Sequence, residues 1–197
     1  MGKYFVENRT LVPYDSLSPF LIDALVATED SRFYTHSGID PRAIGRVIVK
    51  TLLFNKKGSG GGSTISQQLA KLLVGRPDTR NAGKIERLML LFTTKFKEWL
   101  TAVKLERSYT KEEIIALYFN KFDFLYGANG IKSAAEIYYK KTPSNLSITE
   151  AAMLVRMLKN PDLYNPKKFP EKAKKGREQV LRNMFDAGKI TEEEYHH

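Results

Sequence analysis

Glu29 is the residue of this 197-residue chain whose type and position best suit acid–base chemistry. It follows Leu21 and Leu25 by eight and four residues, so it shares the apolar face of a predicted helix. A carboxyl group that is desolvated on such a face suits a general base or a general acid. A structural ion pair with Arg32, three residues later, is the alternative, and spacing alone favours it.

A glycine-rich segment, residues 58–63, leads into a second predicted helix that is capped by Thr64. Free backbone N–H groups and the positive end of the helix dipole would meet there beside Lys56 and Lys57, an arrangement that binds anions. No Gly-Lys-Ser/Thr closes the segment, so it is not a Walker loop. A flexible linker before an ordinary surface helix is the alternative. One face of the helix is nevertheless polar, as is typical of a ligand-binding surface, and it carries Thr64, Gln67, Gln68 and Lys71.

Glu98 is a further carboxylate on an apolar stripe, which it shares with Leu91, Ala102 and Leu105. A lone carboxylate in such a stripe needs either a partner or a function. Lys95, three residues earlier, is an available partner, and a structural ion pair is therefore the default prediction.

The composition restricts the chemistry further. The chain has 0 Cys and 3 His, two of them terminal, so thiolate catalysis is excluded and no metal site is predicted. The internal histidine, His36, is predicted to cap the end of the first helix. The net charge of +10 permits an anionic partner such as nucleic acid, a phosphorylated ligand or lipid headgroups. No uncharged apolar run reaches the roughly 18 to 20 residues that span a bilayer.

Helix-start signals dominate the chain and predict a mainly α protein. Ser18 and Pro19 suit the N-cap and first position of a helix that extends to residues 36–38. Residues 1–15 predict an extended N-terminal arm. No long linker divides the rest, so residues 1–197 are predicted to form a single domain of two lobes. Capping-box pairs mark four further helix starts, at Thr64 and Gln67, Thr110 and Glu113, Ser147 and Glu150, and Thr191 and Glu194.

These motifs have the order and residue types of a known family, and the sequence resembles the peptidoglycan glycosyltransferases of glycosyltransferase family 51. Residues 29–38 match its E-D-x-x-F-x-x-H-x-G motif, and residues 61–71, Gly-Gly-Ser-Thr-Ile-Ser-Gln-Gln-Leu-Ala-Lys, are the most specific match. The third motif is kept in residues 95–98, although Thr94 occupies the position of the family's arginine. Residues 111–120 and 177–184 match the fourth and fifth motifs.

The resemblance implies a lysozyme-like head lobe and a smaller membrane-facing jaw lobe, approximately residues 43–100. It also implies a lipid II polymerase that makes β-1,4-linked glycan with inversion and releases undecaprenyl pyrophosphate. Such an enzyme works at the extracytoplasmic face of the bacterial cytoplasmic membrane and is inhibited by the phosphoglycolipid moenomycin. Its partners would be lipid II, the growing glycan strand and the outer leaflet, but no nucleic acid. A transpeptidase domain in the full-length protein is compatible with the resemblance.

The resemblance also assigns roles to individual residues. Glu29 would be the general base, and Glu98 would orient cations or assist the leaving group. The start of the helix after Thr64 would help to hold the pyrophosphate. No cofactor is obligatory, although the pyrophosphate site admits a divalent cation, Mg²⁺ or Mn²⁺. The substrate-binding residues would be Asp30, Phe33, His36, Ser63, Thr64, Gln67, Gln68, Lys71, Lys95 and Asn120.

Two other functions fit parts of the sequence. A lytic transglycosylase or muramidase would share the lysozyme-like fold and a catalytic glutamate, but cleavage of a neutral glycosidic bond needs no cationic pyrophosphate site. A basic helical module that binds nucleic acid is supported by the net charge of +10 alone.

Overall fold

The computed structural model describes residues 11–54, 62–75, 77–80 and 82–196. In these ranges the chain forms α-helices and short 3-10 helices, together with one isolated β-bridge between Asp123 and Asn129. The mainly α prediction is therefore confirmed. Residues 1–10 of the predicted arm lie outside the described ranges, and its last residues enter a 3-10 helix, Tyr14–Ser16.

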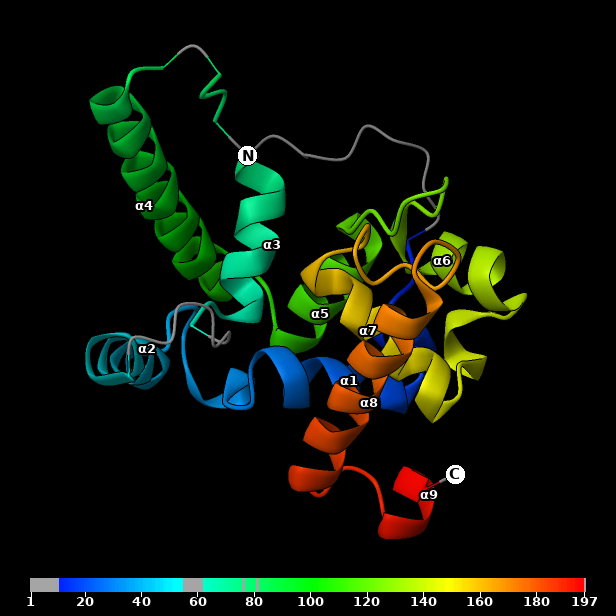
Figure 1. Ribbon diagram of the computed structural model, residues 1–197. Coiled ribbons are helices and arrows are strands. Elements are labelled where there is room, and N and C mark those ends of the chain that lie inside the picture. Colours follow the sequence, from blue (N-terminus) through cyan, green and yellow to red (C-terminus); the bar gives the residue numbers. More distant parts are fainter. Residues whose placement is uncertain (1–10, 55–61, 76, 81, 197) are drawn as a thin grey trace.

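Most of the helices pack around one core, which forms the head of the molecule (Figure 1). Helices α1 and α8 both pack against α7, and α5 packs against α6. Fully buried aromatic and aliphatic side chains fill the centre, among them Phe33, Tyr118, Phe119 and Phe124. The helices of the head are α1 (Pro19–Glu29), α5 (Lys111–Lys121), α6 (Gly130–Tyr139), α7 (Ile148–Lys159), α8 (Pro170–Asp186) and α9 (Glu192–His196), with 3-10 helices η2 (Phe33–Thr35) and η3 (Pro143–Asn145) between them.

Three helices lie to one side of this core: α2 (Pro41–Phe54), α3 (Ile65–Val74) and α4 (Lys84–Ser108). Helix α3 packs along α4 and also contacts α5 (Figure 1). Near the C-terminal end of α4, Ala102 and Leu105 are buried, whereas the N-terminal half of the helix projects beyond the head. This projecting region overlaps the jaw lobe expected at residues 43–100, and the division into lobes stays a prediction. No helix in the described ranges is both long and apolar enough to cross a membrane.

The local signals at helix starts are confirmed. The side chains of Thr64, Thr110 and Ser147 each accept a hydrogen bond from the backbone N–H three residues later. The side chain of that later residue in turn accepts the backbone N–H of the capping residue. Thr191 and Glu194 make the same reciprocal pair ahead of α9. These interactions lie within four residues of sequence, so local chemistry is enough to determine them.

The end of the first helix was predicted wrongly. Helix α1 ends at Glu29 rather than at residues 36–38, and a 3-10 helix follows after a short turn. The Asp30 backbone has φ −159° and leaves the helix, while its carboxylate bonds to the start of α3. The residue that follows the helix is thus bonded to a residue 35 positions away, and no periodicity in the local sequence reports such a contact.

Candidate active site

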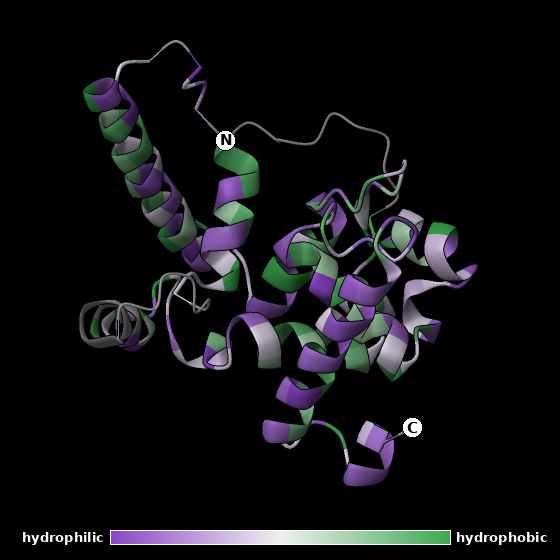
Figure 2. Ribbon diagram, in the orientation of Figure 1, coloured by the Kyte–Doolittle hydropathy of each residue, from purple (hydrophilic) through white to green (hydrophobic). Residues whose placement is uncertain are grey.

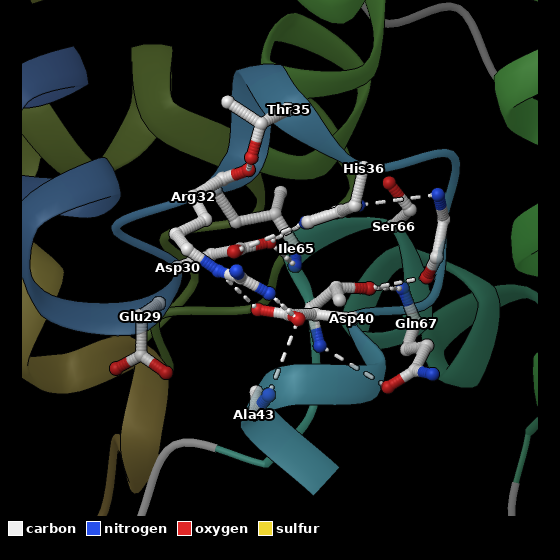
Figure 3. Close-up of polar contacts among 12 residues, drawn as sticks. Glu29, Asp30, Arg32, Thr35, His36, Asp40, Ala43, Ile65, Ser66 and Gln67 are labelled. Carbon is white, nitrogen blue, oxygen red and sulfur yellow. Dashed lines mark hydrogen bonds and ion pairs between the residues drawn. The ribbon is translucent and has the colours of Figure 1, made fainter. Parts of the chain in front are cut away.

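Glu29 is the last residue of α1 and its side chain is partly buried. The carboxylate atom Oε2 accepts a hydrogen bond of 2.9 Å from the side-chain amide Nε2 of Gln68 on α3. Arg32 does not pair with Glu29 but with Asp40, to which its Nε donates at 3.0 Å. Figure 3 shows the Glu29 carboxylate pointing away from this pair. The structural alternative for Glu29, an ion pair with Arg32, is therefore not formed.

Gln68 links Glu29 to a buried tyrosine. The hydroxyl of Tyr118 on α5 donates to the amide oxygen Oε1 of Gln68 at 2.8 Å. Tyr118 is only 1% exposed. Burial raises the pKa of the Tyr118 phenol, and the nearby Glu29 charge raises it further, so the hydroxyl keeps its proton and can donate. Three helices thus meet at one chain of hydrogen bonds that ends on Glu29.

The Asp30 side chain lies at the N-terminal end of α3. Its Oδ2 accepts the backbone N–H of Ile65 at 3.0 Å and lies 2.9 Å from Nε2 of His36 (Figure 3). Both the Asp30 and the His36 side chains are about 95% buried. The helix dipole stabilises a carboxylate at this position. Asp30 therefore joins the segment at residues 29–38 to the glutamine-bearing helix.

This arrangement corrects the predicted anion site at the start of α3. The N–H of Ile65 is taken by Asp30, that of Thr64 by the Gln67 side chain, and that of Gln67 by the Thr64 hydroxyl. Three of the backbone groups that an external anion would need are already satisfied inside the protein. Lys56, Lys57 and residues 58–61 of the glycine-rich segment lie outside the described ranges.

His36 does not cap a helix, contrary to prediction, because α1 ends seven residues before it. Its Nδ1 accepts the backbone N–H of Gly38 at 3.2 Å, which leaves the proton on Nε2, facing Asp30. The same hydrogen bonds fold the 29–38 segment back on itself. The histidine ring thereby supports the carboxylate that holds α3.

A partly buried lysine links the same segment to α4 and α5. Lys111 Nζ donates to the His36 carbonyl at 2.7 Å and to Glu106 at 2.8 Å. It also lies 4.3 Å from the centre of the Phe33 ring, which is fully buried. Ser66 on α3 donates to the same Glu106 carboxylate. Phe33 is thus part of the support beneath the site rather than part of its surface.

Glu98 is buried, at 6% exposed, and pairs with Lys95 at 2.8 Å. The predicted ion pair is therefore confirmed. Lys95 also approaches the Ser63 hydroxyl at 3.4 Å, and its side chain remains 45% exposed. Lys71 is exposed on α3. In the described residues no three or more His, Asp or Glu side chains cluster in a way that could hold a metal ion.

The remaining predicted residues are divided between this cluster and another part of the fold. The Thr64 hydroxyl donates to the Gly38 carbonyl at 2.6 Å, and Gln67 completes the capping box. The Gln67 Nε2 atom is buried, with no hydrogen-bond partner in the described part of the chain. Asn120 is separate, since it bonds to both backbone groups of Val12 and holds the N-terminal segment on α5.

The sequence did not identify the residues whose hydrogen bonds hold the site residues in place. Tyr118, Ser66 and Glu106 are not among the predicted site residues, although Ser66 lies in the second motif. Lys111 and Tyr118 did stand in the fourth family motif, which was the available signal. Glu106 had none, because its partners come from α3 and α5.

A family model described as "Transglycosylase" matches residues 1–185 of this chain. The chain belongs to the transglycosylase family. Penicillin-binding protein 1A of Aquifex aeolicus is 40% identical over 195 residues, which are 98% of this chain and 25% of that protein. Penicillin-binding protein 1A of Escherichia coli is 36% identical over 195 residues, 99% of this chain and 22% of that protein. Penicillin-binding protein 1F of Bacillus subtilis is 35% identical over 194 residues, 98% of this chain and 26% of that protein.

This transglycosylase domain spans about a quarter of the length of these relatives. The family match covers all five motifs that were identified in the sequence, from residue 29 to residue 184. Its first two motifs are the segments that the Asp30 and Gln68 hydrogen bonds join in the structure.

Proposed function

We propose that this domain is a peptidoglycan glycosyltransferase that polymerises lipid II with inversion, with Glu29 as its general base. The observation that supports it best is the hydrogen bond between Glu29 and Gln68, which brings the first two family motifs together. The Glu29 carboxylate of α1 is held by a neutral donor from α3, and α3 also carries the exposed Lys71. A base and a leaving-group cation on adjoining elements suit the transfer of a sugar from a pyrophosphate.

In the proposed reaction, Glu29 removes the proton from the 4-hydroxyl of the acceptor sugar. The resulting oxygen attacks the anomeric carbon of the donor sugar from the face opposite its pyrophosphate. The new C–O bond forms as the bond to the pyrophosphate breaks, and the departing group leaves with the electron pair. The anomeric centre is inverted, and a β-1,4 linkage results.

The leaving group would be stabilised mainly by side chains, since three backbone N–H groups at the start of α3 are already occupied. Lys71 and Lys95 are exposed or partly exposed and are the cations proposed for this task. Glu98 holds Lys95 beside Ser63, and so orients one of these cations. The arginine that the family has at Thr94 is missing, which puts more of the task on these two lysines.

We also propose that the projecting half of α4 rests in the outer leaflet, as the jaw lobe does in this family. Its ribbon alternates between hydrophobic and hydrophilic residues (Figure 2), and the side chains of Ile85, Leu88 and Phe92 are each at least 70% exposed. A patch of this kind in a protein of net charge +10 suits an anionic membrane surface. Phe92→Ser should reduce binding to anionic vesicles, while Tyr126→Ser, an exposed aromatic in the head, should leave it unchanged.

The wider setting is proposed from the relatives. Their names are those of penicillin-binding proteins, of which this chain spans about a quarter. A transpeptidase domain in the full-length protein and a location on the extracytoplasmic face of the cytoplasmic membrane would follow. Lipid II and the growing strand would then be the direct partners of this domain.

Incubation with labelled lipid II in detergent, followed by separation of polymer from monomer, tests the proposed reaction. The wild type should make glycan that lysozyme digests, and Glu29→Gln should make none while it still binds moenomycin. A Glu29→Gln variant that polymerises at the wild-type rate would remove the base assignment. Soluble muropeptides released from purified sacculi would instead indicate a lytic enzyme.

A further inference from the structure

We propose that Tyr118 is a positioning residue for Glu29 and that it acts through the side-chain amide of Gln68. The inference rests on the proposed function, because it takes Glu29 to be the base. It also gives Gln68 a different role from the substrate binding that its motif implies. Both ends of the Gln68 amide are occupied by protein groups, Tyr118 at one end and Glu29 at the other.

The direction of this hydrogen-bond chain follows from the chemistry of its two ends. An ionised carboxylate can only accept hydrogen bonds, so the NH₂ group of the Gln68 amide has to face Glu29. The amide oxygen then faces Tyr118, and the tyrosine hydroxyl has to donate. The burial of Tyr118 keeps it in the protonated form that this requires. Each end therefore determines the orientation of the other.

Tyr118 is the rigid end of this chain of hydrogen bonds. Its ring lies in the core of the head, 1% exposed, and contacts Phe119 and Phe122 with ring centres 6.2 and 6.1 Å away. Gln68, in contrast, is only partly buried and has a flexible side chain. A glutamine amide that lacks a partner at its oxygen can turn over and present that oxygen to a carboxylate, which repels it. The tyrosine hydroxyl prevents this turn.

The consequence for catalysis is a carboxylate with one oxygen fixed and its orientation defined. Oε2 of Glu29 is held by Gln68, and the other oxygen, Oε1, is then directed by the geometry of the carboxylate. A general base that is held in this way needs less rearrangement to reach the acceptor hydroxyl. Neither Tyr118 nor Gln68 needs to touch the substrate for this effect.

Tyr118→Phe is the test variant because it removes one oxygen atom and retains the packed ring. We expect kcat for lipid II polymerisation to fall about 3- to 10-fold, the range for loss of one hydrogen bond, with KM and moenomycin affinity unchanged. Tyr138→Phe is the matched control. Its hydroxyl is hydrogen-bonded too, to the Phe124 carbonyl at 2.9 Å and from Asn165 at 2.8 Å, but in another part of the head. This control should keep the wild-type kcat.

A double-mutant cycle separates positioning from general structural damage. Gln68→Leu should lower kcat at least as much as Tyr118→Phe, and the two changes together should cost no more than Gln68→Leu alone. Independent effects, or a wild-type kcat in Tyr118→Phe, would overturn the inference. Glu29→Gln is measured beside them. If it is inactive while Tyr118→Phe is unimpaired, the base assignment stands and the positioning role fails, whereas an active Glu29→Gln removes the base assignment itself.

Discussion

Gly38→Ala is expected to destabilise the protein by pushing the 29–38 segment off α4. Gly38 has φ +94°, in the region that favours glycine, and its carbonyl accepts the Thr64 hydroxyl at 2.6 Å. A Cβ atom at this position would lie 2.9 Å from the backbone oxygen of Ala102 and 3.2 Å from Cγ of Glu106. The oxygen belongs to the backbone of α4, so it cannot move aside as a side-chain end can.

Two costs add in this variant. The left-handed backbone costs a residue with a Cβ about 1 to 2 kcal/mol. Overpacking against a fixed neighbour costs about 1 to 3 kcal/mol more. A total of about 3 kcal/mol in the free energy of unfolding corresponds to a fall of about 6 to 12 °C in Tm for a domain of this size.

Gly188→Ala separates the two costs. Gly188 also has a positive φ, +65°, but nothing lies within 4 Å of its added Cβ. It should therefore lose only about 1 to 2 kcal/mol, from the backbone alone. Urea unfolding followed by far-UV circular dichroism measures both variants. Equal losses in the two would refute the argument that the 29–38 segment packs tightly on α4.

Three further predictions concern the supports of the site and the stability of the head. Thr64→Ala should lower the free energy of unfolding by about 2 kcal/mol, about twice the effect of Thr110→Ala, because the Thr64 hydroxyl also bonds to the 29–38 segment. Urea unfolding of both variants measures the difference. Lys111→Met should cost about 3 kcal/mol because it leaves the Glu106 carboxylate buried without its cation, and adding Glu106→Gln should recover part of the loss in the same assay. Burial acts to raise the pKa of Glu150, but the hydrogen bonds from its lysine and serine neighbours outweigh it and hold that pKa below its ordinary value. The ionised carboxylate therefore contributes its full stabilisation above about pH 4.5, and this is lost as the pH falls through the lowered pKa. The difference in free energy of unfolding between wild type and Glu150→Gln should accordingly shrink in acid. A constant difference down to about pH 2 would contradict this.

The sequence predicted the parts of the fold that depend on near neighbours. All four capping boxes formed where they were expected, since each joins a side chain to the backbone three residues away. The ion pair of Lys95 and Glu98 formed for the same reason, at one turn of helix. Glu29 was found from its position on an apolar stripe, although the role that follows from this stays a prediction.

The errors lie where residues remote in the sequence compete for the same group. Arg32 had Glu29 three residues before it, and the structure pairs it with Asp40 instead. The start of α3 had every local feature of an anion site, and Asp30 of the preceding motif occupies it. In both cases the folded chain supplies a different partner from the one that the sequence spacing suggested.

By itself the sequence determined a mainly α chain, its helix starts and the family motifs, because these are written in residue types within one or two turns of helix. Only the tertiary structure decided how the site is held. The bonds that orient Glu29 join residues 39 and 50 positions apart, and they form only when α1, α3 and α5 pack together. The orientation of an amide depends on both of its partners at once, and a linear sequence does not specify which partners those are.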